Sequence, residues 1–467
     1  MKREIAKNKT EQETAGAAVH RTVNGQSKGA APNDMTNFSL MRKALWIVGI
    51  LLVFEVLIYC IHIPMGIVSD DAYHLEHGVL AENLFELIRG RFFSNGRFLT
   101  DGAAFFAYHL PFSAWKILDS GMYGVLLILI WRMFTDRSEE MFFICAGNLL
   151  MFPIYTLLQS AGYIATSANY IYTFTALLIG VFPVIKCIRQ EHCHAVFYLL
   201  SLSGIVYTCN QDQMGVICIG AFFFICAVYL VRWIRNQRRE DFRVLLQSTA
   251  YLLISLLVFG LMFLVPGHIE RMKSTAEMEA YLPVYAEWST GYKLYRGAAT
   301  TFAWLFFSQP ALLQLFCLSL LVAVYIWNRR MIVFPVLLLM LTTAVQGIDR
   351  ECFVIIYEYA YHMPDLQEIS THPQAIIVSI LIFILMILSV AALWNRCRDL
   401  CVSLFILNIL GFGSRIMMGF SATIYASSFR TFTAQLLMFA ICNILVAGKI
   451  LERMRRYSGI QMATDRS

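Results

Sequence analysis

Two adjacent carboxylates stand directly after the first long apolar stretch of the chain. The segment reads "IVSDDAYH", in which Asp70 and Asp71 are followed by His74. A carboxylate can take a proton from a hydroxyl group, and a neighbouring acid can raise its pKa or share a cation with it. The structural alternative is that the acids cap the free N–H groups at the start of a helix. We expect Asp71 to be the more exposed acid and the base, with Asp70 as its orienting or metal partner; the reverse assignment stays open.

Further polar side chains recur where later apolar stretches end. The candidates for substrate binding are His74, Asn95, Arg97, Asn169, Tyr170, Asp212, Arg271 and Arg430. Arginines that converge on one cavity would form a bidentate fork for phosphate, whereas a lone arginine near a membrane is usually a headgroup anchor. No CxxC pair and no Walker loop occurs. A divalent cation shared by the acids is the one cofactor left open.

The composition indicates a membrane protein. Of the 467 residues, 58% are hydrophobic and only 15% are charged, whereas a soluble domain has roughly 25% charged residues. The apolar stretches are continuous and long enough to cross roughly 30 Å of hydrocarbon, without the alternation of a β-barrel. The formal charge of +6 does not indicate nucleic-acid binding, because the basic residues gather at the ends of these stretches. We expect an all-α, multi-pass membrane protein.

The basic residues also predict the topology, since short cytoplasmic connections are rich in Lys and Arg. We expect a disordered cytoplasmic tail at 1–39, a polytopic domain at 40–450 and a cytoplasmic tail at 451–467. The predicted localisation is a bacterial plasma membrane with both termini in the cytoplasm. About twelve spans are expected, at residues 43–63, 117–134, 141–157, 168–189, 195–209, 214–233, 244–265, 308–327, 331–347, 374–394, 400–418 and 429–450.

This topology places the two acids on the outer side. Residues 64–116 become a long first external loop, and residues 266–307 become another external segment. The apolar positions of the first loop predict two amphipathic helices that lie in the membrane interface. Glu55 lies within the first expected span, so we expect it to face the helix bundle and pair with a polar neighbour.

Four short motifs carry a resemblance to a known family. In order along the chain they are "DD", "NGR", "SANY" and "PGHIER". This order resembles a family of uncharacterised bacterial multi-pass membrane proteins, which is itself similar to the GT-C glycosyltransferases. The resemblance covers roughly residues 43–435. The chain departs from the usual pattern at His268, where Asn is common, and at Asp212, where Glu is frequent.

The resemblance implies a function for the external acids. Asp70 or Asp71 would be the catalytic base of a membrane glycosyltransferase. The donor would be a polyprenyl-phosphate-linked sugar, and the acceptor a cell-envelope glycan or lipid on the outer face. Arginine or a metal ion would stabilise the departing phosphate. Membrane lipids are the other expected partners, and nucleic acid is not one.

Two other functions compete with this one. A lipid-linked glycan flippase or other transporter would show internal repeats and charged groups at the membrane midplane. The two halves of this chain do not repeat each other, and Glu55 is the main residue in favour of a transporter. A non-catalytic assembly partner is the third possibility. Convergence of Asp70, Arg97, Arg271 and Arg430 on one outer cavity would favour the transferase.

Overall fold

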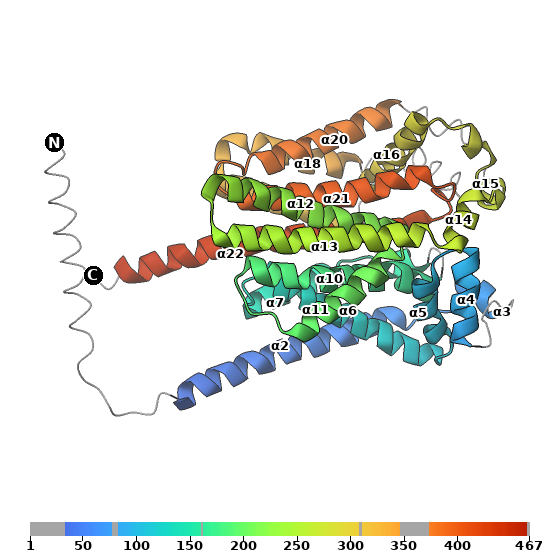
Figure 1. Ribbon diagram of the computed structural model, residues 1–467. Coiled ribbons are helices and arrows are strands. Elements are labelled where there is room, and N and C mark those ends of the chain that lie inside the picture. The colour runs from blue at the N-terminus through green and yellow to red at the C-terminus, as the bar shows by residue number, and fades with distance from the viewer. Residues whose placement is uncertain (1–32, 77–82, 160–161, 308–310, 346–372, 465–467) are drawn as a thin grey trace. The chain divides into compact units, whose positions relative to one another are not determined.

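The computed structural model describes residues 33–76, 83–159, 162–307, 311–345 and 373–464 (Figure 1). Within these ranges the chain forms helices and the turns between them, and no strand. The chain divides into two compact units, Met1–Val48 and Gly49–Ser467. The first unit contains the beginning of α2 (Asn33–His62), and the second contains all the other described helices.

Seven helical segments among the described residues are long and apolar enough to cross a membrane, which agrees with an α-helical membrane protein. Those segments are Met41–His62, Phe112–Phe134, Tyr163–Ile188, Asp212–Asn236, Arg239–Phe263, Arg398–Phe420 and Phe429–Tyr457. They include all or most of α2, α6 (Phe112–Phe134), α10 (Tyr172–Ile188), α12 (Asp212–Asn236), α13 (Arg239–Phe263), α21 (Arg398–Ile416) and α22 (Thr433–Thr464). A bent pair, α16 (Thr290–Phe307) with α17 (Ala311–Trp327), would make an eighth span if it crosses as one unit.

Shorter helices occupy the other expected spans. These are α7 (Glu139–Leu150), α11 (Ala195–Cys209), α18 (Val333–Ala344) and α20 (Pro373–Ala391), together with α17. Each of the twelve expected spans therefore overlaps a helix, although the number of true crossings stays a prediction. The start of α7 illustrates the local signals, because the side chain of Ser138 accepts a hydrogen bond from the N–H of Met141 and two glutamates follow it. The serine oxygen accepts a hydrogen bond from a free N–H group, and the glutamates place negative charge at the positive end of the helix.

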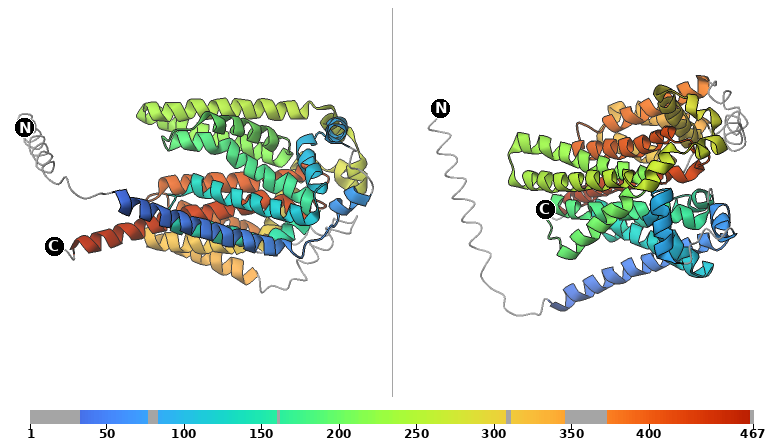
Figure 2. Two further views of the ribbon diagram at one scale, coloured as in Figure 1. Left: turned by 90° about the horizontal axis from the view of Figure 1, so that it is seen from below. Right: turned by 45° about the vertical axis from the view of Figure 1, so that its right-hand side comes forward.

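Short helices gather at one end of the second unit, seen in two directions in Figures 1 and 2. They are α3 (Asp70–Glu76), α4 (Leu84–Ser94), α5 (Phe98–Tyr108) and α14 (Pro266–Lys273). We call this the short-helix end. Helix α4 packs against both α5 and α14. All four are too short to span a membrane, as expected for the first loop, whose position in an interface stays a prediction.

Some helices extend beyond the segments expected from the sequence. Residues 33–39 already belong to α2, where Asn33 and Asp34 are residue types favoured at helix starts. Residues 1–32 lie outside the described part. Helix α6 begins at Phe112, five residues before the expected span. Helix α22 continues through residues 451–464, because charge pairs one turn apart, such as Lys449 with Glu452, stabilise it.

The expected external segment at 266–307 contains a long helix that the sequence analysis did not predict, while its position outside the membrane stays a prediction. Its second half forms the long helix α16, which packs against α20 and α21. In the sequence, the polar residues Arg296, Thr300 and Thr301 interrupt the apolar stretch of this helix. In the structure these residues are buried, and the hydroxyl groups of both threonines donate to backbone carbonyls one turn earlier in the helix. A helix can therefore bury them without losing hydrogen bonds.

Candidate functional site

Asp71 is a buried structural anchor at the short-helix end. Its carboxylate accepts a hydrogen bond from the hydroxyl group of Tyr108 at 2.7 Å. It also accepts from the backbone N–H groups of Ile164 at 2.9 Å and Ala165 at 3.1 Å. These N–H groups belong to the first turn of α9 (Tyr163–Thr166), where no carbonyl of the helix can reach them. Asp71 thus joins α3, α5 and α9 and caps a helix other than its own.

The surroundings of Asp71 leave little space for a ligand. Its side chain is fully buried. Gly162 has φ +98°, and a Cβ atom there would lie 2.7 Å from the Cγ of Asp71. Burial raises the pKa of the Asp71 carboxyl group, while the hydrogen bonds from Tyr108 and from the backbone at Ile164 and Ala165 oppose this rise. The expectation that Asp71 is the more exposed acid is therefore wrong, because three elements close over its carboxylate.

Asp70 is the accessible acid of the pair. Its side chain is 51% exposed, and its Oδ2 atom lies 3.1 Å from Nη1 of Arg430. Arg430 belongs to the 3₁₀ helix η7 (Ser428–Phe432), which directly precedes α22. Its Nε atom is buried and has no hydrogen-bond partner among the described residues. Asp71 faces α9, whereas Asp70 faces Arg430. A ligand could therefore reach Asp70 and Arg430.

Asp212 is the centre of a second charged group. Its carboxylate lies 3.1 Å from Nη2 of Arg97 and 3.6 Å from Nη1 of Arg271. The Nδ1 atom of His268 lies 4.0 Å from its Oδ1 atom. We call these four residues the Asp212 cluster. Asp212 begins α12, Arg97 precedes α5, and the other two residues lie on α14.

Two glycines allow these elements to approach one another. Gly96 has φ +76°, and a Cβ atom there would lie 2.9 Å from the Cβ of His268. A Cβ atom on Gly267 would lie 2.6 Å from the backbone nitrogen of Asn95. Glycine suits the left-handed backbone at residue 96, and neither position has room for a Cβ atom. The "NGR" and "PGHIER" motifs therefore meet through their glycines, which brings Arg97 and Arg271 to the same carboxylate.

The Asp212 cluster brings two guanidinium groups, those of Arg97 and Arg271, to one carboxylate. Burial, the largest single influence, would lower the pKa of Arg97, but Asp212, Tyr170 and Asp101 together outweigh it, and this pKa is raised. Burial lowers the pKa of His268 below 6.5, with Asp212 opposing and the arginines assisting, so its imidazole is neutral near pH 7. Since the Asp212 side chain is 40% exposed, the cluster can bind an anionic oxygen from solvent or lipid.

Asn95 has a structural role in the turn before α5. Its side-chain oxygen accepts a hydrogen bond from the backbone N–H of Arg97 at 2.9 Å. Its amide nitrogen donates to Asp101 at 3.3 Å, and Asp101 also pairs with Arg91 at 3.1 Å. Asn95 therefore orients the Arg97 turn, and its predicted contact with a substrate stays a prediction.

The "SANY" motif forms a π-helical turn. This turn, η1 (Ser167–Ile171), connects α9 to α10 and contains Asn169 and Tyr170. The amide nitrogen of Asn169 donates to the carbonyl of Ala165, while its Oδ1 atom is buried without a partner in the described part of the chain. Such turns occur frequently at functional sites. His74 lies within α3, and its side chain is outside what the structure describes.

A fully buried His–Asp pair is a feature that the sequence analysis missed. Nε2 of His62 lies 2.7 Å from Oδ2 of Asp119, and the Nδ1 atom of His62 is bonded to the carbonyl of Ile58. The signal in the sequence is an aspartate inside the apolar segment of α6. Glu55 also faces α6, because its Oε1 atom occupies the space where a Cβ atom of Gly124 would lie.

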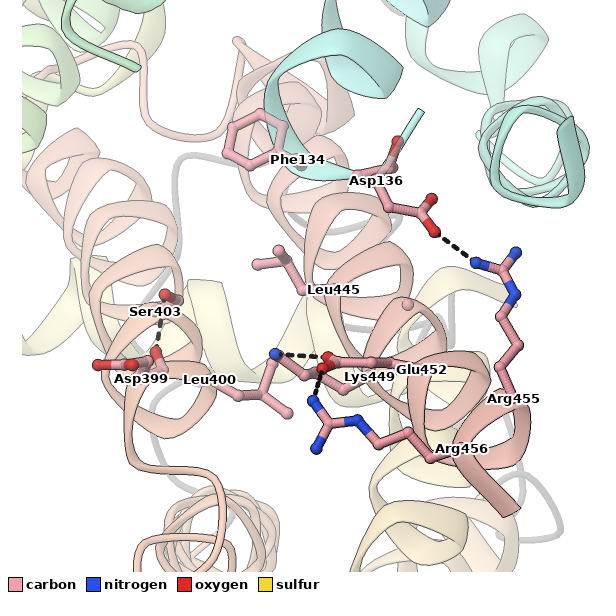
Figure 3. A pocket seen from close by; sticks show the side chains of 12 residues that line it. Phe134, Asp136, Asp399, Leu400, Ser403, Leu445, Lys449, Glu452, Arg455 and Arg456 are labelled. Carbon is pink, nitrogen blue, oxygen red and sulfur yellow. Dashed lines mark hydrogen bonds and ion pairs between the residues drawn. The ribbon is translucent and has the colours of Figure 1, made fainter. Parts of the chain in front are cut away.

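A cavity of about 590 Å³ lies at the opposite ends of α6, α21 and α22 (Figure 3). Its charged side chains pair with one another or with charged residues nearby, such as Arg232 and Glu140. Lys449 contacts Glu452 at 2.8 Å, and Arg455 contacts Asp136 at 2.6 Å. All the predicted site residues lie away from this cavity. The pairing of its charges leaves it less suited to an ionic ligand than the short-helix end.

The predicted divalent cation finds no obvious ligand group. Within the described ranges, no cluster of three or more His, Cys, Asp or Glu side chains could hold a metal ion. Asp70 and Asp71 do not form a joint site, because Asp71 is bonded to Tyr108 and α9. No protein-family model matches the chain, and no curated protein or solved structure matches it. The resemblance to GT-C enzymes therefore stays a prediction.

Proposed function

We propose that this protein is a GT-C-like membrane glycosyltransferase with about twelve membrane helices. It would transfer a sugar from a polyprenyl-phosphate donor to a cell-envelope glycan or lipid, at the outer face of a bacterial plasma membrane. The observation that supports this proposal is that the two acids have different surroundings. Asp71 is held by three hydrogen bonds. Asp70 is half-exposed, and within the described part of the chain its ion pair is with Arg430.

Asp70 is the proposed general base. It accepts the proton of the acceptor hydroxyl group as the hydroxyl oxygen attacks the anomeric carbon of the donor sugar. The new glycosidic bond forms as the bond from that carbon to the phosphate oxygen breaks, and the bonding electrons leave with the phosphate. Asp71 acts as a positioning residue, because its bonds to α9 fix the start of α3, where Asp70 stands.

The departing phosphate needs positive charge. Arg430 lies beside Asp70, and Arg97 and Arg271 both lie against the carboxylate of Asp212. Preorganised cations of this kind stabilise charge that develops in a transition state. Tyr170 on the π-helical turn lies within electrostatic reach of Arg97, so the turn borders the same group. Arg97, Arg271 and Arg430 are the proposed phosphate-binding residues, and a divalent cation remains a possible addition to them.

The test compares Asp70→Asn with a matched control. Asp136→Asn removes a carboxylate of similar exposure, 50%, which pairs with Arg455 far from the proposed site. Cells that lack the protein would be complemented with wild type or either variant, and their envelope glycans and lipid-linked sugars measured by mass spectrometry. We expect Asp70→Asn to accumulate donor and to lower product by about 10²–10⁴-fold, with Asp136→Asn like wild type. Wild-type product from an Asp70→Asn protein of normal abundance would refute the proposal.

A transporter is the second candidate, and the buried His62–Asp119 pair favours it. Both side chains are fully buried within segments that are long enough to span a membrane. Ionisable residues at such positions often line ion or substrate pathways. The same complementation separates the two functions. A transporter predicts that Asp119→Asn abolishes the phenotype while Asp70→Asn has no effect, and a transferase requires Asp70.

A further inference from the structure

Arg415, in the last turn of α21, is a buried cation without an acidic partner. Its side chain is fully buried. Among the described residues, its three guanidinium nitrogens have no hydrogen-bond partner and no carboxylate within 4.0 Å. A guanidinium group keeps its proton even when it is buried. Because a buried charge without compensation is strongly unfavourable, Arg415 indicates a place where a negative charge binds.

The neighbours of Arg415 do not neutralise it. Its guanidinium carbon lies 5.4 Å from the ring centre of Trp304 and 4.7 Å from that of Phe432. Aromatic rings attract a cation through their faces, but they leave its N–H groups without acceptors. Tyr425 lies within electrostatic reach of Arg415, yet burial raises the pKa of this tyrosine, so it is a neutral phenol. Its hydroxyl oxygen already accepts a hydrogen bond from Nε of Arg296 at 2.8 Å.

A buried amide lies against the same face of α21. The side-chain oxygen of Gln435 lies where a Cβ atom on Gly411 would be 2.1 Å from it, and Gly411 is one helical turn before Arg415. Residues four apart share one face of a helix, and side chains lean toward the helix N-terminus, so Arg415 extends toward this turn. Gln435 is fully buried, and neither atom of its amide has a partner in the described part of the chain. A guanidinium group and an amide NH₂ group are both donors that can bind an anion.

We propose that Arg415 binds a small monovalent inorganic anion, with chloride as the physiological ligand and Gln435 as a second donor. The valence follows from charge balance, because Arg415 contributes one uncompensated positive charge. The size follows from burial, because a fully buried guanidinium group is accessible to a bare ion more readily than to an anion attached to a lipid or a glycan. The bound ion would stabilise the junction of α21 with α22. This inference goes beyond the proposed function and does not depend on it.

The test measures equilibrium binding of radioactive chloride to the purified full-length protein in phosphatidylcholine nanodiscs. We expect saturable binding by the wild type, and Arg415→Met should weaken it by about tenfold or more, the usual effect of a lost charge-assisted hydrogen bond. Arg455→Gln, at the cavity on the opposite side of the bundle, is the control with unchanged affinity. Chloride binding that is lost in Arg97→Met but kept in Arg415→Met would place the ion at the Asp212 cluster and overturn the proposal. Displacement of chloride by farnesyl monophosphate but not by inorganic phosphate would assign Arg415 to a lipid phosphate, and would overturn it too.

Thermal unfolding in sodium chloride and in sodium gluconate, at equal ionic strength, gives a second measurement. Wild type should melt at a higher temperature in chloride, because a ligand that binds only the folded state stabilises it. Arg415→Met should melt at the same temperature in both salts, since it has no charge to compensate. If this variant does not fold, Arg415→Lys decides, because an ammonium group cannot reproduce the planar fork and should bind chloride less tightly than the wild type. A wild-type protein whose melting is the same in both salts, or wild-type chloride affinity in the folded Arg415 variants, would overturn the site.

Discussion

Replacing Asp71 by Asn should damage the structure, while the same change at Asp70 should damage only activity. An Asn side chain has one accepting oxygen where the Asp71 carboxylate has two. If its NH₂ group takes the place of Oδ2, the buried N–H of Ile164 loses its acceptor at 2.9 Å. If it takes the place of Oδ1, the hydroxyl of Tyr108 and the N–H of Ala165 lose theirs.

The magnitude follows from these bonds. A buried donor without an acceptor costs about 1–3 kcal/mol, and the remaining bonds weaken because the acceptor is no longer charged. We therefore expect Asp71→Asn to lower the free energy of unfolding by about 3 kcal/mol. Asp70 is half-exposed and has an ion pair with Arg430, and exposed pairs of this kind contribute about 0–1 kcal/mol. Asp70→Asn should consequently unfold almost like wild type.

The assay is thermal unfolding of the purified variants in one detergent at one scan rate, with Asp136→Asn as the control. The expected order places Asp71→Asn well below the other three proteins, which should melt together. A wild-type melting temperature for Asp71→Asn would refute the assignment of this residue as the cap of α9. A large loss of stability in Asp70→Asn would refute the separation of roles between the two acids.

Two further predictions concern local structure. Gly162→Ala should destabilise the protein by about 1–3 kcal/mol, since the residue has φ +98° and faces Asp71. Gly121→Ala is its control, because a Cβ atom there meets nothing within 4 Å; equal melting of the two variants would contradict the prediction. Hydrogen bonds from Arg137 and Lys186 hold the pKa of Glu191 at about 2, below its ordinary 4.5, so its contribution to stability is present above pH 4.5 and is lost as the pH falls toward 2. Glu191→Gln should therefore melt lower than wild type at pH 7 and approach it at pH 2, and a gap that stays constant with pH would exclude this ion pair as the cause.

The sequence by itself determined the class of the protein and the place of its helices. Continuous apolar stretches can satisfy their backbone only as helices in a membrane, so each expected span overlaps an observed helix. The gathering of polar motifs at helix ends was also visible, because "DD" and "PGHIER" directly follow apolar stretches. These are local properties, which depend on residues that are neighbours along the chain.

Which partner each polar side chain contacts was decided only by the tertiary structure. Adjacent acids look equivalent in a sequence, yet Asp71 turns toward α9, ninety-three residues later, and Asp70 turns toward Arg430. Likewise, nothing near Asp212 in the chain predicts its pairing with Arg97, which depends on how α5 and α12 pack. The close approach of α16 to the end of α21 is likewise a tertiary feature, since a Cβ atom on Gly297 would lie 2.0 Å from the backbone oxygen of Ile416. Hydrogen bonds and burial between distant segments are set by packing, and packing is not a local property of the chain.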